Sequence, residues 1–194
     1  MARSKEFDRD EAVKRAMAVF WEKGYEATST DDLLRAMGIG RQSMYDTFGD
    51  KHRLYLEALQ RYQTDGQIEL FERFRASASP LAELREFLVA ISNGSPAERM
   101  RGCLAVNAAT EFGRVDPEVA MLIDAGTTHC EAVFARVVQE AKKKGEVGSA
   151  VDERAAARFI HSTIRGLRVS AKAGASREAL RDIASFAIAG LKGA

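Results

Sequence analysis

Apolar residues recur at steps of three and four positions along most of this chain, and no stretch shows sustained alternation of apolar and polar residues. This pattern is typical of amphipathic helices and predicts an all-α fold. Its apolar stripes and turn residues predict helices over residues 8–24, 29–37, 41–48, 50–74, 81–92, 101–112, 117–144, 152–172 and 176–191.

Residues that favour helix ends agree with this division. Asp8 precedes the first apolar stripe with Glu11 three positions later, as in a capping box, and Asp50 stands before the fourth helix. Pro80, Pro96 and Pro117 stand at or near helix starts or in turns, where the missing N–H costs little. We expect two domains, at residues 1–50 and 51–194.

The second and third predicted helices are short and are joined by a glycine turn at residues 38–40. This is the frame of a helix-turn-helix, whose second helix enters the major groove of DNA. Arg41, Gln42 and Ser43 start that helix, where side chains reach base edges. Tyr45 and Thr47 offer hydroxyls to phosphates or bases, and Lys51 adds a charge at the next helix start.

A larger set of residues around this turn carries a resemblance to a known family. The set is Phe20, Gly24, Tyr25, Thr28, Ser29, Gly38, Ile39, Met44, Tyr45, Phe48 and Lys51. The segment looks like the DNA-binding region of TetR/AcrR regulators. The resemblance implies a three-helix DNA-binding domain, a connecting fourth helix, a larger helical ligand-binding and dimerisation domain, and a homodimer.

The resemblance also assigns roles to single residues. It implies that Tyr45 and Lys51 hold phosphates and that residues 41–43 face bases, and it adds Thr28 to the DNA-binding set. The chain departs from the family pattern in two places: Gly40 replaces a capping Ser or Thr, and Thr47 replaces a His that touches the DNA backbone.

The amino-acid composition limits the classes of protein to which this chain can belong. Apolar residues make up 46% of the chain and charged residues 29%, as in ordinary globular proteins, and the net charge of +1 gives no bulk signal for nucleic acid. The two cysteines form no CxxC pair, which excludes a zinc-finger pattern and gives no support to a disulfide framework. No signal peptide or membrane span is visible, so we expect a cytoplasmic protein that does not enter membranes.

The longer part of the chain offers candidates for a ligand pocket. Cys103, Asn107 and Glu111 are spaced four residues apart, on one face of the helix predicted over 101–112. Apolar candidates are Phe71, Phe74, Met121 and Phe134, and polar anchors are His129, His161 and Arg165. Each apolar residue taken alone fits a plain core role better than a place in a pocket, and the alternative for Arg165 is a surface or dimer salt bridge.

The last two predicted helices carry small residues at regular steps, among them Gly166 and Gly190, beside apolar residues that include Leu180 and Phe186. Such faces suit a two-fold interface of four helices, so we expect a homodimer through these helices.

The whole pattern favours a ligand-responsive regulator, most simply a repressor that binds a palindromic operator as a dimer and releases it when a small molecule binds. His129, Cys130 and His161 keep a metal-responsive repressor open as an alternative, and a helical carrier or enzyme without DNA binding is the other. We predict no catalytic residue, bound metal or cofactor. The effector and the operator sequence stay open.

Overall fold

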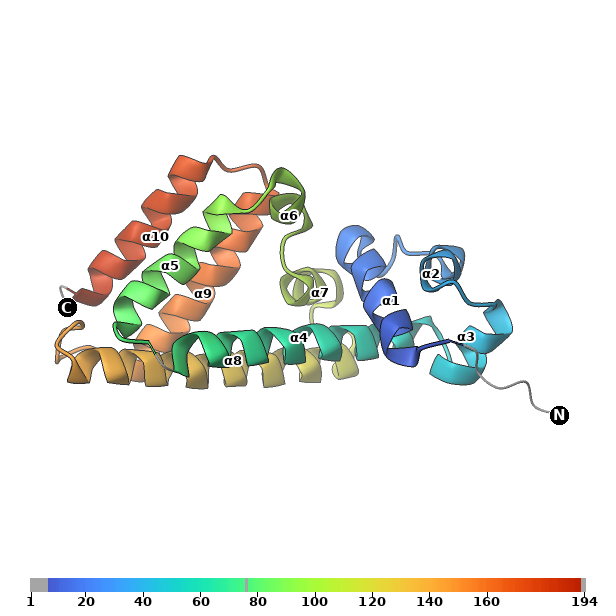
Figure 1. The fold of residues 1–194 in the computed structure, drawn as a ribbon, viewed down its shortest axis with the longest axis horizontal. Coiled ribbons are helices and arrows are strands. Elements are labelled where there is room, and N and C mark those ends of the chain that lie inside the picture. The colour runs from blue at the N-terminus through green and yellow to red at the C-terminus, as the bar shows by residue number, and fades with distance from the viewer. Residues whose placement is uncertain (1–6, 76, 193–194) are drawn as a thin grey trace.

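The computed structural model describes residues 7–75 and 77–192, and these residues form ten helices and no strand. The helices are α1 (Arg9–Lys23), α2 (Thr30–Met37), α3 (Arg41–Phe48), α4 (Lys51–Arg75), α5 (Pro80–Asn93), α6 (Pro96–Arg101), α7 (Leu104–Phe112), α8 (Pro117–Lys143), α9 (Glu153–Lys172) and α10 (Arg177–Lys192). Helices α1–α3 lie at one end of an elongated molecule, and α5, α9 and α10 lie at the other (Figure 1).

Local capping explains most helix starts. Ser29 and Asp32 form a capping box at α2, in which the Ser29 hydroxyl accepts from the Asp32 N–H and the Asp32 carboxylate accepts from the Ser29 N–H. The Asp8 carboxylate accepts a hydrogen bond from the Glu11 N–H at α1, at 3.1 Å. These bounds agree with the sequence-based ones to within one or two residues.

One prediction of a helix is wrong. Only Arg101 of the segment predicted as one helix over 101–112 lies in α6, a helix that was not predicted, and Gly102 and Cys103 separate it from α7. Gly102 has φ of +69°, and Cys103 is extended at the N-cap of α7. Cys103 therefore does not share a helical face with Asn107 and Glu111, and the three side chains go to different places.

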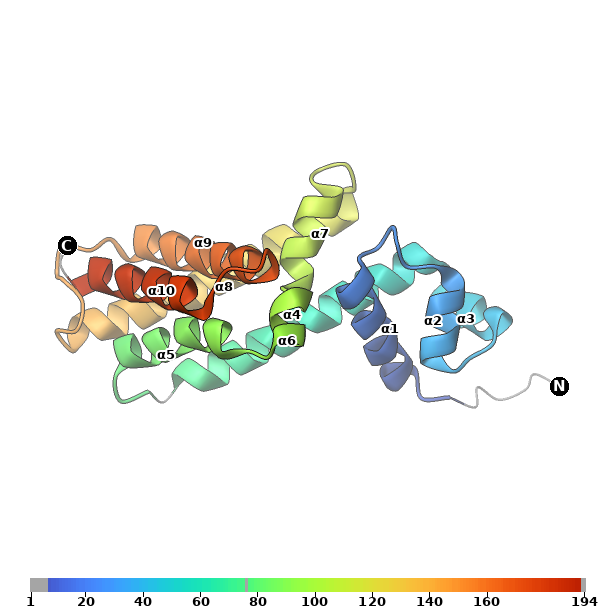
Figure 2. The same ribbon diagram turned by 90° about the horizontal axis from the view of Figure 1, so that it is seen from above.

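The first hydrophobic cluster holds the helix-turn-helix together. Phe20 of α1, Leu33 of α2 and Met44 of α3 are fully buried in it, together with Leu54 and Leu59 from the first half of α4. Figure 2 shows α1, α2 and α3 gathered around the start of α4. The cluster also takes in parts of α7 and α8, so the domain boundary placed at residue 50 stays a prediction and does not mark a break in packing.

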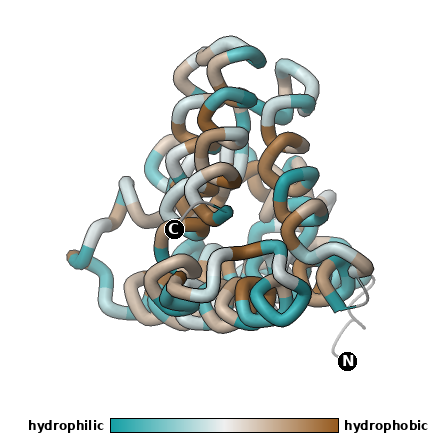
Figure 3. Tube along the Cα trace, turned by 90° about the vertical axis from the view of Figure 1, so that its left-hand side faces the viewer, coloured by the Kyte–Doolittle hydropathy of each residue, from teal (hydrophilic) through white to brown (hydrophobic). Residues whose placement is uncertain are grey.

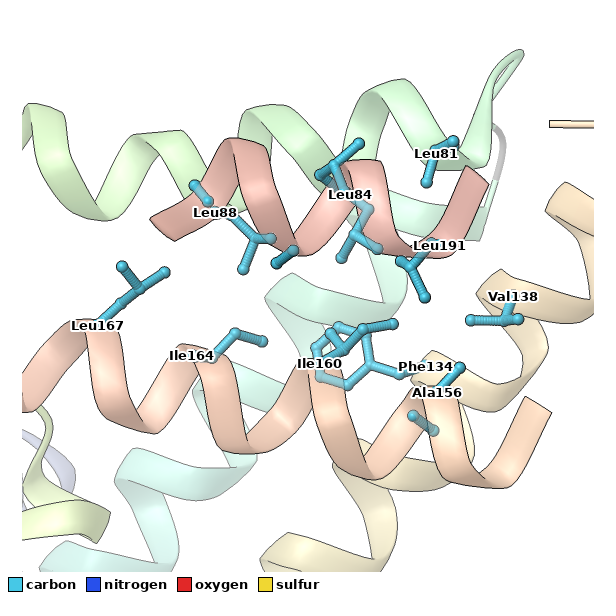
Figure 4. Close-up of a cluster of buried hydrophobic side chains, with 14 of the residues drawn as sticks. Leu81, Leu84, Leu88, Phe134, Val138, Ala156, Ile160, Ile164, Leu167 and Leu191 are labelled. Atoms are coloured by element: carbon cyan, nitrogen blue, oxygen red, sulfur yellow. The ribbon is translucent and has the colours of Figure 1, made fainter. Parts of the chain in front are cut away.

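The second hydrophobic cluster lies where α5, α8, α9 and α10 meet (Figure 4). Its large members include Leu84, Leu88, Phe134, Ile160 and Leu167. Hydrophobic and hydrophilic segments alternate along the Cα trace of the molecule (Figure 3). Helices of this kind can bury an apolar face against each other and keep a polar face toward water. In the described part of the chain, no helix combines the length and the apolarity that crossing a membrane would need.

Candidate DNA-binding surface and ligand cavity

The outer face of α3 is polar and its side chains are held by acidic neighbours. Arg41 donates to Asp31 of α2 at 2.6 Å, and Gln42 donates to Asp46 at 2.8 Å. Tyr45 is exposed, whereas Ser43 is half-buried. Gly40 caps α3 without a side-chain acceptor, which leaves the first-turn N–H groups open to an outside acceptor.

Three other residues of the predicted DNA-binding set have different surroundings. Thr28 is 0% exposed and its hydroxyl donates to the Gly24 carbonyl, so in this structure the side chain holds the turn after α1 and does not lie on the outer face. The Thr47 hydroxyl oxygen is buried and has no hydrogen-bond partner among the described residues. The Lys51 Nζ lies 4.3 Å from the centre of the Tyr25 ring, a cation–π contact at the start of α4.

A cavity of about 400 Å³ lies between the two ends of the molecule. Its walls come from α1, α4, α5, α7, α8 and α9 and from Cys103, so it draws on most of the chain. Four aromatic side chains line it: Trp21, Tyr62, Phe87 and Phe134. Such a largely apolar hollow with a few polar groups is typical of small-molecule sites.

The structure brings some of the predicted ligand-binding residues to this cavity. Cys103, Phe134, His161 and Arg165 all line it. Phe74 lies outside the lining and packs against Phe87 and Phe134.

Other members of the predicted set lie elsewhere. Asn107 accepts a hydrogen bond from Lys172 at 3.1 Å and lines a separate, shallower hollow. Phe71, Met121 and His129 are exposed and are not part of the cavity wall. Across residues 7–75 and 77–192, no three His, Cys, Asp or Glu side chains are grouped so that they could hold a metal ion.

Burial shapes the ionisation of the groups at the cavity. It lowers the pKa of His161, with the nearby Arg165 charge as the second cause, so the imidazole is neutral near neutral pH. Burial also raises the pKa of the Cys130 thiol and that of Tyr62, whose hydroxyl donates to the Cys103 sulfur at 3.3 Å. The arginines are therefore the principal positive charges of the wall.

The cavity region is joined directly to α1, the first helix of the DNA-binding domain. The Trp21 indole N–H donates to the Gly102 carbonyl at 3.2 Å, beside Cys103. Glu111, near the end of α7, accepts hydrogen bonds from the backbone N–H groups of Tyr25 and Glu26 at 2.9 and 2.7 Å. Two contacts of different kinds thus tie α1 and the turn that follows it to the α6–α7 region.

Two family models match this chain and between them cover most of it. The model described as bacterial regulatory proteins of the tetR family matches residues 12–58, and the model described as a tetracyclin repressor-like C-terminal domain matches residues 80–186. The chain belongs to the TetR family.

Individual transcriptional regulators resemble this chain along most or nearly all of their length. The HTH-type transcriptional regulator YezE of Bacillus subtilis (strain 168) is 36% identical over 94% of this chain and 95% of its own. The HTH-type transcriptional repressor ComR of Escherichia coli (strain K12) is 31% identical over 94% of this chain and 88% of its own. The regulator CifR, solved as a cysteine mutant with a 26-bp operator DNA, superposes with a TM-score of 0.82 at 29% identity over 97% of this chain and 99% of that one.

Sequence reasoning missed several residues of the cavity in this TetR-family chain. Trp21 was not singled out because α1 was assigned to the DNA-binding domain alone, and Tyr62 was not singled out although it lies within the predicted ligand-binding domain at residues 51–194. Arg168 was also missed, although a signal for it exists: His161, Arg165 and Arg168 follow the i, i+4, i+7 pattern of one helical face.

Proposed function

We propose that this TetR-family regulator binds an operator as a homodimer through α3 and releases it when a small molecule enters the cavity. The observation that carries this proposal is the exposed polar start of α3, set in a fold that matches an operator-bound protein over 97% of the chain. Insertion of α3 into the major groove would exchange the bonds to Asp31 and Asp46 for contacts with DNA.

The outward faces of α9 and α10 support the dimer. Phe159 and Val169 on α9, with Ile183 and Phe186 on α10, are large apolar residues that the chain leaves exposed. Gly166 meets no other atom within 4 Å of where a Cβ would stand, and the same is true of Gly190, so these small residues do not serve packing within the chain. Leu180, by contrast, is buried in its own chain and does not belong to this face.

The contacts between cavity and helix-turn-helix support the release. A ligand that contacts Trp21 also contacts α1, which packs directly against α2. A shift of α1 or α7 would move the reading helices of the two protomers relative to each other, and DNA binding depends on their spacing.

Gel shift of the purified protein on the DNA upstream of its own gene, over a series of salt concentrations, tests the proposal. We expect a complex whose affinity falls steeply with salt and exceeds that for unrelated DNA of equal length by about a thousandfold. Equal affinity for both DNAs at every salt concentration would contradict operator recognition.

Lys51→Ala is expected to weaken binding to every DNA sequence and to reduce the slope of log affinity against log salt by about 1, because one phosphate contact is lost. Lys143→Ala is the matched control: it removes the same charge at the far end of α8, where Lys143 pairs with Glu140. If both variants keep the wild-type slope, Lys51 is not a phosphate contact.

Arg41→Ala and Gln42→Ala are each expected to relax base preference at one position per half-site. Arginine pairs bidentately with guanine and glutamine with adenine, and each good pair discriminates by about 1 to 3 kcal/mol. Operator selection from a random DNA library measures the preference, with Arg35→Ala on the exposed face of α2 as control. An unchanged preference in both variants, with only overall affinity lost, would make these residues backbone contacts.

A further inference from the structure

We propose that the effector is an organic monoanion, a molecule with an apolar body and a single carboxylate or similar charge that Arg165 and Arg168 hold. The inference rests on the proposed function, because it names the class of ligand that this cavity takes.

The positive end of the site is formed by two arginines one turn apart on α9. Both line the cavity and both are half-buried. Neither makes an ion pair or a side-chain hydrogen bond with another residue in the part of the chain that the structure describes. A guanidinium held partly out of water favours an anionic partner, and its planar donors fit a carboxylate in two parallel hydrogen bonds.

The acidic residues that line the cavity determine how much of the positive charge of the two arginines is left uncompensated. Asp65 is already paired with Arg61, whose single Nε–H is shared between the two carboxylate oxygens at 3.0 Å each, so its charge is compensated. Glu69 is exposed and lines both this cavity and the neighbouring hollow that Arg168 also lines. Two arginines against Glu69 leave one uncompensated positive charge, and His161 adds none because it is neutral.

The remaining surface of the cavity fits an apolar body. Trp21, Phe87 and Phe134 present aromatic surfaces to it, and Ile164 stands on the same helix as the arginines. Gln63 adds a neutral amide whose position depends on Gly126: a Cβ there would meet the Gln63 Nε2 at 2.8 Å. A volume of about 400 Å³ is within the usual range for small organic ligands.

Trp21 provides the measurement, because it is the only tryptophan of the chain and it lines the cavity. We would titrate the full-length protein with 3-phenylpropionate and octanoate and with their neutral amides, 3-phenylpropanamide and octanamide. We expect at least one carboxylate to change the Trp21 fluorescence with an affinity about tenfold or more above that of its amide.

Variants of Arg165 and Arg168 test whether these two side chains cause the preference for carboxylates over amides. Arg165→Gln and Arg168→Gln are expected to bring the carboxylate and amide affinities to within about threefold of each other. Arg154→Gln on the same helix, exposed and outside the cavity wall, should keep the wild-type ratio. Unchanged ratios in both cavity variants would overturn the assignment to these arginines.

Two results would overturn the ligand class itself: equal affinity for acid and amide in both pairs, or no fluorescence change with either carboxylate up to millimolar concentration. The gel shift on the same preparation separates this failure from that of the proposed function. A protein that binds its operator but shows no carboxylate preference loses only the ligand class, whereas one that binds no DNA contradicts the regulator proposal whatever the fluorescence shows.

Discussion

Phe186→Asp is expected to convert the dimer into a folded monomer and to weaken operator binding by about a hundredfold or more. Phe186 is 81% exposed on α10, so a charge there costs the single chain little. In a dimer the same charge would be taken out of water without a partner. A monomer also loses the avidity of two linked half-site contacts, which ordinarily contributes a factor of about 100 to 10,000.

Light scattering at micromolar concentration and gel shift measure these two effects. Ile68→Asp is the matched control, because Ile68 is 59% exposed on α4, outside the face formed by α9 and α10. The control should stay dimeric and bind the operator. A Phe186→Asp protein that also stays dimeric would contradict the assignment of α10 to the interface.

Leu180→Asp is expected to unfold the C-terminal bundle. Leu180 stands on the same helix as Phe186 but is 0% exposed, and it packs in the cluster formed with α5 and α9. Losing this side chain and burying an unpaired carboxylate should cost at least about 4 kcal/mol. That loss is a large share of the roughly 5 to 15 kcal/mol that stabilises a typical domain.

Circular dichroism and thermal unfolding distinguish this variant from the interface variant. We expect Leu180→Asp to lose helical signal or to aggregate, and Leu180→Ala to fold with a lowered melting temperature. A Leu180→Asp protein that melts like the wild type would show that this position is not part of the core. The sequence predicted Leu180 and Phe186 to lie in the dimer interface because both lie on an apolar stripe of α10. In the structure Leu180 is buried within its own chain and Phe186 is exposed.

Helix ends were predictable because the interactions that set them are local. Ser29, Asp32 and Asp116 cap helices that start within three residues of them in the sequence. The start of α7 at Leu104 and the additional helix α6 are also set locally, by Gly102 and by the capping box of Ser95 and Glu98, but the prediction from apolar positions began one helix at residue 101 and included none over 96–100.

The cavity was only partly predictable because its walls come from six helices. Phe134 and His161 were found from apolar or polar positions on long helices, whereas Trp21 enters the cavity through the way α1 lies against α4 and α7. No periodicity in one segment contains that information. Thr28 shows the reverse case, since its place in a family pattern suggested DNA while its hydroxyl is bonded inside the turn.

The contact between Trp21 and the Gly102 carbonyl places the cavity against α1 of the DNA-binding domain. The cavity and the DNA-binding domain share α1, so the two binding events are thermodynamically linked. If the bound effector lowers the affinity for the operator by some factor, the bound operator lowers the affinity for the effector by the same factor. A dimer bound to its operator then has a lower affinity for the effector than a free dimer, so the effector binds to the free dimers first. The concentration of effector needed for induction therefore rises with the amount of regulator the cell holds in excess of its operators.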